Sequence, residues 1–234
     1  MTTTPIVALD VPSIERARSI VRTLGDACTW YKVGLELFVS EGPHVVTWLR
    51  EEGKEVFLDL KLHDIPNTVR GAARAAAGLG ARLLTVHASG GEAMLAAAVE
   101  GAGAQDGYHC GILAVTVLTS MSERDVGAAW GRDAVSVETE VLRLAAATRR
   151  AAAHGIVCSG IEAPAVCALF GDALAVLVPG VRAAGSASHD QVRVVTPEVA
   201  AQAGARYVVL GRMVTAATDP AAAFEAASAE LAGR

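Results

Sequence analysis

The sequence lacks the features that mark several large classes of protein. None of its apolar runs approaches the roughly 20 residues that a membrane-spanning helix needs. Its first five residues show no basic stretch leading into an apolar segment, so we expect no secretory signal. The net charge of −5 comes without any block of basic residues, which argues against nucleic acid as the main partner.

Cysteine is also scarce, and no two cysteines form a Cys-x-x-Cys pair. They lie mostly within apolar runs, which favours reduced thiols in the core over disulfides or zinc ligands. We therefore expect a cytoplasmic protein without a metal site. The cysteines are Cys28, Cys110, Cys158 and Cys167.

A glycine-rich turn after the first apolar run would indicate a doubly wound dinucleotide-binding sheet, and it is missing. The residues at that point are Asp10-Val11-Pro12-Ser13. No stretch of the chain has the composition of an interdomain linker. We therefore expect one domain over residues 1–234.

The chain contains instead a repeated alternation of short apolar runs and helix-compatible segments. Continuous apolar runs are typical of strands buried on both faces. The expected strands are Ile6–Leu9, Trp30–Val33, Val56–Leu60, Leu83–Val86, Ile112–Val117, Ile156–Cys158, Ala175–Val178 and Tyr207–Leu210. Ser13, Thr196 and Asp219 stand where helix caps belong, the last two directly before a proline. Eight such units predict an α/β fold, the (β/α)8 TIM barrel.

Charged residues gather around the third expected strand. Asp59 and Lys61 are two residues apart, so their side chains should leave the same face of a strand. Asp64 follows as the strand gives way to a loop, and Pro66 marks the entry into a helix. An Asp-x-Lys pair alone often forms a structural ion pair. Three charges beside an apolar run are costly, however, unless they neutralise one another or take part in chemistry.

Other expected strands also end in polar residues. These are Asp10, Lys32, His87, Thr119 with Ser122, Ser159, Arg182, and Gly211 with Arg212. Such residues at the carboxyl ends of several strands are typical of a barrel active site. After the seventh and eighth strands barrels commonly bind phosphate, and the guanidinium of Arg212 suits phosphate oxygens. We therefore expect a phosphate site there.

Two further features were interpreted from the sequence. The irregular stretch over residues 180–192 is a candidate lid, with Gln191 placed to contact a ligand on closure. His63 and His87 have no partners at metal-ligand spacing, so we interpret both as structural.

The residues from Asp59 to Thr68 resemble the signature of the orotidine 5′-phosphate decarboxylase family in its bacterial short form. The Asp-x-Lys-x-x-Asp core is shared with related sugar-phosphate decarboxylases and aldolases, and the continuation His63-Asp64-Ile65-Pro66-Asn67-Thr68 distinguishes the nucleotide enzymes. The resemblance extends over essentially the whole chain. The other segments that carry it are residues 7–10, 31–34, 117–121 and 179–182, and Gly211-Arg212.

The resemblance implies a homodimer that converts orotidine 5′-monophosphate to UMP and CO2, the last step of de novo pyrimidine synthesis, without a metal or other cofactor. In that family Lys32, Asp59 and Lys61 would form a charged array that stabilises a C6 carbanion, with Lys61 as proton donor. Asp64 and Thr68 would come from the partner subunit. Asp10 and Lys32 would contact the ribose of the substrate, and Thr119 and Ser122 its pyrimidine. The phosphate would be bound by Arg182, Gln191, Gly211 and Arg212.

Two alternatives stay open at this point. A sugar-phosphate decarboxylase or hexulose-phosphate synthase of the same superfamily would need Mg2+, and few carboxylates are available at the strand ends to hold it. The other is a catalytically inactive barrel that only binds nucleotides or a partner protein, and the intact Lys32, Asp59, Lys61 and Asp64 argue against it.

Overall fold

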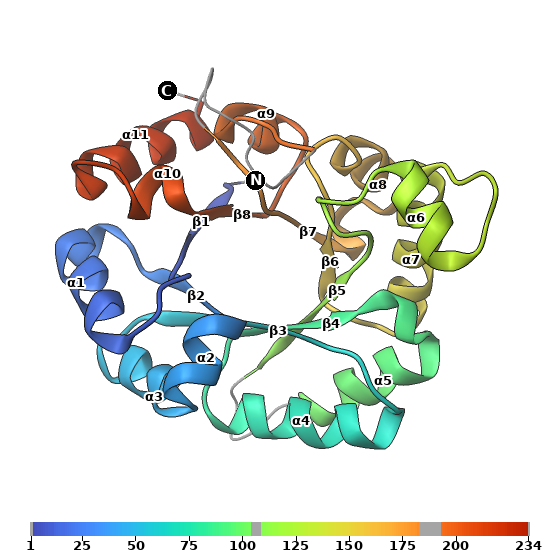
Figure 1. Cartoon of the computed structure of the whole chain (residues 1–234), viewed down its shortest axis with the longest axis horizontal. Coiled ribbons are helices and arrows are strands. Elements are labelled where there is room, and N and C mark those ends of the chain that lie inside the picture. The colour runs from blue at the N-terminus through green and yellow to red at the C-terminus, as the bar shows by residue number, and fades with distance from the viewer. Residues whose placement is uncertain (1, 104–108, 183–192, 234) are drawn as a thin grey trace.

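The chain folds into a closed barrel of parallel strands in which each strand pairs with the next and β8 pairs with β1 (Figure 1). This computed structural model describes residues 2–103, 109–182 and 193–233. The strands are β1 (Thr4–Ala8), β2 (Trp30–Gly34), β3 (Glu55–Leu62), β4 (Leu83–His87), β5 (Gly111–Val115), β6 (Gly155–Val157), β7 (Ala175–Val178) and β8 (Tyr207–Leu210). All eight expected strands are present, and the predicted TIM barrel is confirmed.

The helices form a ring outside the strands (Figure 1). They are α1 (Ile14–Leu24), α2 (Leu35–Glu41), α3 (His44–Glu51), α4 (Pro66–Gly78), α5 (Glu92–Gly101), α6 (Glu123–Trp130), α7 (Val137–Arg150), α8 (Ala163–Phe170), α9 (Pro197–Gln202), α10 (Arg212–Thr215) and α11 (Pro220–Leu231). Short 3-10 turns cover Gly25–Ala27, Ala88–Gly90 and Gly171–Ala173. The expected caps are confirmed, since Ser13, Thr196 and Asp219 each accept a backbone N–H of the first turn that follows.

Six of the eight expected strand ends differ from the structure by one or two residues: β1 and β6 stop one residue early and β5 two, whereas β2 and β4 run one residue further and β3 two. β5 stops at Val115 rather than Val117 because its neighbour β6 stops at Val157, the residue that pairs with Val115. β1 stops at Ala8, so Asp10 lies two residues beyond the strand. The end of β5 is set by the neighbouring strand, and a single apolar run carries no information about its neighbour.

The core has two layers. One fills the space between the outer faces of the strands and the helices. The other fills the barrel interior with side chains such as Ile6, Phe57, Leu113, Leu177 and Val209. Inward and outward positions alternate along each strand, so the inward residues continue toward the carboxyl ends as the lining of whatever lies there.

Two expected absences can be compared with the structure. Within the described ranges, no helix is both long and apolar enough to cross a membrane. Cys28, Cys110 and Cys158 are free and buried, and Cys167 is free and half-buried.

Candidate active site

A cavity of about 510 Å³ opens at the carboxyl ends of the strands. Much of its lining continues the inward-facing rows of the barrel interior. On β3, Phe57 lies in the core and Asp59 lines the cavity; on β8, Val209 reaches both and Gly211 follows. The alternation that fills the barrel with apolar side chains therefore also selects which residues face the cavity.

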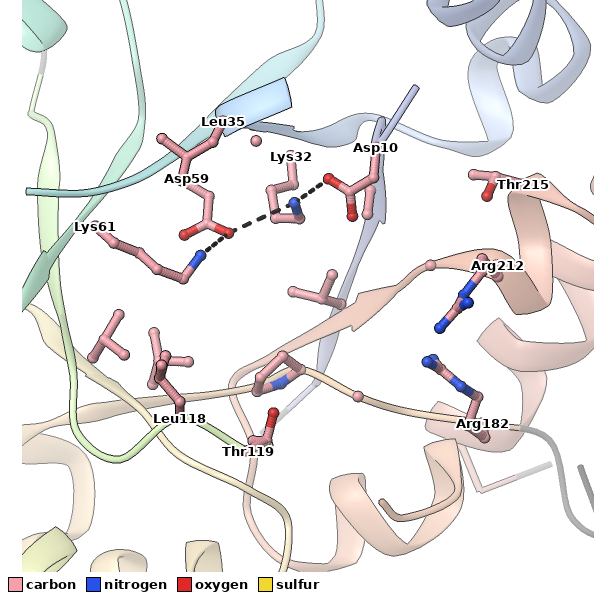
Figure 2. Close-up of a pocket in the computed structure, with 18 of the residues that line it drawn as sticks. Asp10, Lys32, Leu35, Asp59, Lys61, Leu118, Thr119, Arg182, Arg212 and Thr215 are labelled. Atoms are coloured by element: carbon pink, nitrogen blue, oxygen red, sulfur yellow. Dashed lines mark hydrogen bonds and ion pairs between the residues drawn. The ribbon is translucent and has the colours of Figure 1, made fainter. Parts of the chain in front are cut away.

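Four charged side chains form a row of alternating sign along one side of this cavity (Figure 2). The ammonium of Lys32 lies 2.6 Å from Asp10 Oδ1 and 3.6 Å from Asp59 Oδ2. The ammonium of Lys61 lies 2.8 Å from the same Asp59 oxygen. The chain brings these four residues together from β2, β3 and the segment after β1. Lys32, Asp59 and Lys61 were expected as a charged array with Asp64, whereas Asp10 was expected as a ribose contact.

Asp59 is the centre of the row and is only 8% exposed. Burial alone would raise the pKa of its carboxyl. The two lysine ammonium groups, together with hydrogen bonds from Lys61 and Thr85, outweigh burial and hold the pKa below its ordinary value. Asp59 is therefore an anion over the whole physiological range, and it fixes both ammonium groups in place.

Lys61 reaches the cavity through an unusual backbone conformation. Its φ of 49° lies in the left-handed region, where a residue with a side chain is strained. The register between β3 and β4 also shifts here: Leu58 pairs with Leu84, but Leu62 pairs with Val86. Three residues of β3 therefore face one residue of β4. Regular alternation correctly predicted that Asp59 and Lys61 share a face, but not this bulge.

Two arginines occupy the other end of the cavity. Arg182 follows β7 and Arg212 follows β8, and Figure 2 shows both guanidinium groups across the cavity from Lys61. Thr119 also lines the cavity, as does Gly211. Both were expected, whereas Thr215, a further lining residue on α10, was not.

Other expected site residues do not line this cavity. The Ser122 hydroxyl is engaged elsewhere: it accepts the Asp125 N–H and lies 2.7 Å from the Asp125 carboxylate at the N-terminus of α6. The short loop after β5 ends in this cap, which keeps Ser122 outside the cavity lining. Asp64 and Thr68 are exposed in this chain and lie outside the lining. Gln191 and most of the candidate lid lie outside the described residues.

The two histidines interpreted as structural lie beside one another, with ring centroids 5.4 Å apart. Burial, His63 and the nearby Lys61 lower the pKa of His87, despite the opposing effect of Asp59. His87 is therefore neutral at physiological pH. Among the residues that the structure describes, no group of three or more His, Cys, Asp or Glu side chains is arranged to hold a metal ion.

Sequence reasoning missed the reason for a glycine at position 34. A Cβ atom there would lie 2.7 Å from Asp10 Oδ1 and 2.9 Å from Lys32 Nζ, closer than real Cβ contacts. Gly34 therefore provides the space in which the Asp10–Lys32 ion pair forms. The motif Tyr31-Lys32-Val33-Gly34 contains this glycine, but only the fold shows which atoms need the space.

A buried ion pair that the sequence did not reveal supports the segment carrying Thr119. Arg193 donates to Glu162 at 2.6 Å and to the carbonyl of Leu118 at 3.0 Å. Glu162 in turn accepts from the hydroxyl of Ser159 at 2.6 Å. These contacts tie the loops after β5 and β6 to the chain just before α9, and so hold Leu118 and Thr119 at the cavity.

The chain matches the model of the Orotidine 5′-phosphate decarboxylase / HUMPS family over residues 3–227. It belongs to this family. An orotidine 5′-phosphate decarboxylase of Anaeromyxobacter sp. (strain K) is 50% identical over 228 residues, which cover 96% of each chain. One from Nitrosococcus oceani is 47% identical over 229 residues, covering 97% of this chain and 96% of the relative.

Solved structures agree with this membership. The crystal structure of orotidine 5′-phosphate decarboxylase from Lactobacillus acidophilus superposes with a TM-score of 0.87 at 37% identity, covering 99% of both chains. That from Pyrococcus horikoshii OT3 has a TM-score of 0.79 at 26% identity, covering 99% of this chain and all of the other. The predicted family and fold are confirmed.

Proposed function

We propose that this protein removes the carboxylate of orotidine 5′-monophosphate to give UMP and CO2, the last step of de novo pyrimidine synthesis. The row Asp10–Lys32–Asp59–Lys61 is the observation that carries the proposal. The row places fixed cations and anions beside the cavity, and two of them, Lys32 and Asp59, are buried. Two arginines lie at the other end of the same cavity. The names of the relatives support the same reaction.

The chemistry needs a cation beside the reacting carbon. When the C6–CO2 bond breaks, its electron pair stays on C6 in the plane of the ring, where no conjugated group can accept it. An ammonium fixed next to C6 stabilises this carbanion more than it stabilises the substrate. Lys61 is suited to this role because Asp59 holds its ammonium at 2.8 Å. It then gives a proton to C6, and water returns a proton to the resulting amine.

Asp59 would have a second effect, since its carboxylate would lie near the carboxylate of the substrate. Two neighbouring anions repel, and the repulsion falls as neutral CO2 forms. We treat this contribution as smaller than that of the fixed ammonium groups, which act directly on the developing charge.

The rest of the cavity suits the other parts of a nucleotide. Asp10 and Lys32 would hold ribose hydroxyls, and Thr119 would face the pyrimidine. Arg182, Arg212 and Gly211 would bind the phosphate, together with Gln191. Binding energy gained at the phosphate, far from C6, would then be used to order the site around the reacting carbon.

The protein would act in the cytoplasm as a dimer, with residues 1–234 as one catalytic domain. Asp64 and Thr68 would complete the partner's site. Their exposure in a single chain supports this, as do large apolar side chains exposed directly after β2 and β3: Leu35 at 51%, Val39 at 80% and Ile65 at 67%. The segments after neighbouring strands lie side by side at the barrel rim, and apolar surface of this kind favours association.

The function is tested by following the loss of orotate absorbance when the purified protein meets orotidine 5′-monophosphate. We expect turnover that survives EDTA, with UMP as the product. Absence of turnover would reject the proposal. Turnover of a keto-sugar phosphate that EDTA abolishes would favour the hexulose-phosphate branch of the family instead.

Shared sites are tested by mixing two inactive variants, Asp64→Ala and Lys61→Ala. Each hybrid dimer has one site with both residues intact, so an equal mixture should recover up to about a quarter of wild-type activity. Mass spectrometry under native conditions would verify that hybrids form. Hybrids without activity would contradict a site built from two subunits.

A further inference from the structure

Thr85 is the residue of β4 that faces the bulge of β3. It is fully buried, at 0% exposed, between the inward-facing Leu83 and His87. The register shift leaves Asp59, Leu60 and Lys61 opposite Thr85 alone. A regular parallel ladder, with one residue facing one residue, is therefore interrupted at the two residues that carry the central charges of the site.

The Thr85 hydroxyl makes two hydrogen bonds in this gap. It accepts the backbone N–H of Lys61 at 2.9 Å and donates to Asp59 Oδ1 at 2.8 Å. The other oxygen of the same carboxylate, Oδ2, accepts a hydrogen bond from the Lys61 ammonium at 2.8 Å. One hydroxyl thus connects the backbone of Lys61 to the anion that holds its side chain.

This closed set of contacts has a physical consequence for Lys61. Its backbone has a left-handed φ of 49°, a conformation that persists only where surrounding contacts impose it. The bond from its N–H to Thr85 is such a contact, and it replaces a partner that the ladder would otherwise supply. Without the hydroxyl, both the buried N–H and one oxygen of Asp59 would lose a partner.

We propose that Thr85 is a positioning residue for the decarboxylation, acting through its hydroxyl to fix both the Lys61 backbone and the Asp59 carboxylate. This inference rests on the proposed function. Thr85 does not itself line the cavity, and its hydroxyl bonds to Asp59 and Lys61 rather than to the residues proposed to hold the ribose and the phosphate. Its removal should therefore slow the chemical step while leaving nucleotide binding nearly intact.

The test compares Thr85→Val, which keeps the shape and loses the hydroxyl, with Thr85→Ser, which keeps the hydroxyl. For Thr85→Val we expect kcat to fall about 100-fold, with UMP binding within about threefold of wild type. Thr85→Ser should stay within about tenfold of wild type. Thr148→Val is the matched control, because Thr148 is equally buried but donates only to Leu144 of its own helix.

The outcomes separate this inference from the proposed function. If the wild type does not turn over orotidine 5′-monophosphate, the proposed function fails. If the wild type is active and Thr85→Val keeps kcat within about threefold, the role of Thr85 is rejected. Equal losses of kcat and UMP binding, without rescue by serine, reject it too, because they indicate a general structural defect.

A second pair of variants covers the case in which Thr85→Val does not fold. Thr85→Ser and Thr85→Ala both lose the methyl group, and only serine keeps the hydroxyl. A kcat of Thr85→Ala that is at least about tenfold below that of Thr85→Ser, at similar UMP affinity, supports the proposal. Equal kcat values overturn it.

Discussion

Two ionisable side chains that are shielded from solvent at opposite ends of this barrel differ in their charge: Asp59 is ionised and His154 is neutral. At the carboxyl end, Asp59 is buried beside Lys32 and Lys61 and keeps its charge. At the amino end, a second cavity is lined by Trp30, Arg82, His109, His154 and Arg206, among others. There burial lowers the pKa of His154 to about 4, and the neighbouring Arg206, His109 and Arg82 add to the shift.

Both groups have cations as neighbours, so a group keeps its charge only where that charge is opposite to the charge of its neighbours. A buried carboxylate between two ammonium groups is stabilised as an ion. The half-buried imidazole of His154 stays neutral at neutral pH, and its Nε2 lies 3.1 Å from the hydroxyl of Tyr207. The carboxyl end is therefore suited to stabilise charge in a reaction, and the amino end contributes to stability instead.

The largest expected effect comes from removing a charge at the carboxyl end. Lys61→Ala should lower turnover by more than about 10⁴-fold, since it removes the group that we propose as both the cation beside C6 and the proton donor. Circular dichroism and UMP binding should change little, because the arginines at the other end of the cavity are untouched. Near-normal turnover of this variant would take Lys61 out of the chemistry.

A smaller effect is expected from disturbing the row of charges without removing any. Gly34→Ala would put a Cβ atom against both Asp10 and Lys32 and push the ion pair apart. We expect kcat/KM to fall roughly 10- to 100-fold in the decarboxylase assay. Gly78→Ala, at the end of α4, is the control, because its Cβ would meet nothing within 4 Å. A Gly34→Ala enzyme as active as Gly78→Ala would show that the space is not needed.

The smallest effect concerns the amino end and stability. The folded state takes up a proton on His154 only near pH 4, whereas the unfolded chain does so near its ordinary value of 6.5. Stability should therefore fall as pH drops from about 6.5 to 4, by roughly 1–3 kcal/mol from this residue. Urea unfolding of His154→Gln should show a flatter pH dependence over this range.

The exposed His44 gives the control for that measurement. His44→Gln should leave the pH dependence of the unfolding free energy as in wild type. An unchanged profile in His154→Gln would mean that the acid sensitivity arises elsewhere.

Several elements were predictable because their signals are local. The eight apolar runs gave the strands, and caps such as Ser13 and Thr196 gave the starts of helices. Strand ends were less predictable: the end of β5 depends on where β6 ends, and no local signal carries that information. Ser122 illustrates the same limit, since its hydroxyl caps α6 and does not line the cavity.

The sequence contains a weak signal for the role of Thr85. It is the one hydroxyl residue in the apolar run of β4, at an inward position beside the strand that carries Asp59 and Lys61. The run reads as a buried strand, and a threonine is common in one. The register shift that gives Thr85 its role arises only when β3 and β4 pair.

The sequence by itself determined the barrel, the family and the set of charged residues at the strand ends. The barrel follows from the succession of apolar runs, the family from the resemblance carried by the motif Asp59–Thr68, and the charged residues from their places at the ends of those runs. Only the tertiary structure decided how the charges alternate in space, why position 34 is glycine, and which hydroxyl supports Lys61. Those properties depend on distances between separate strands, and such distances exist only once the barrel has closed.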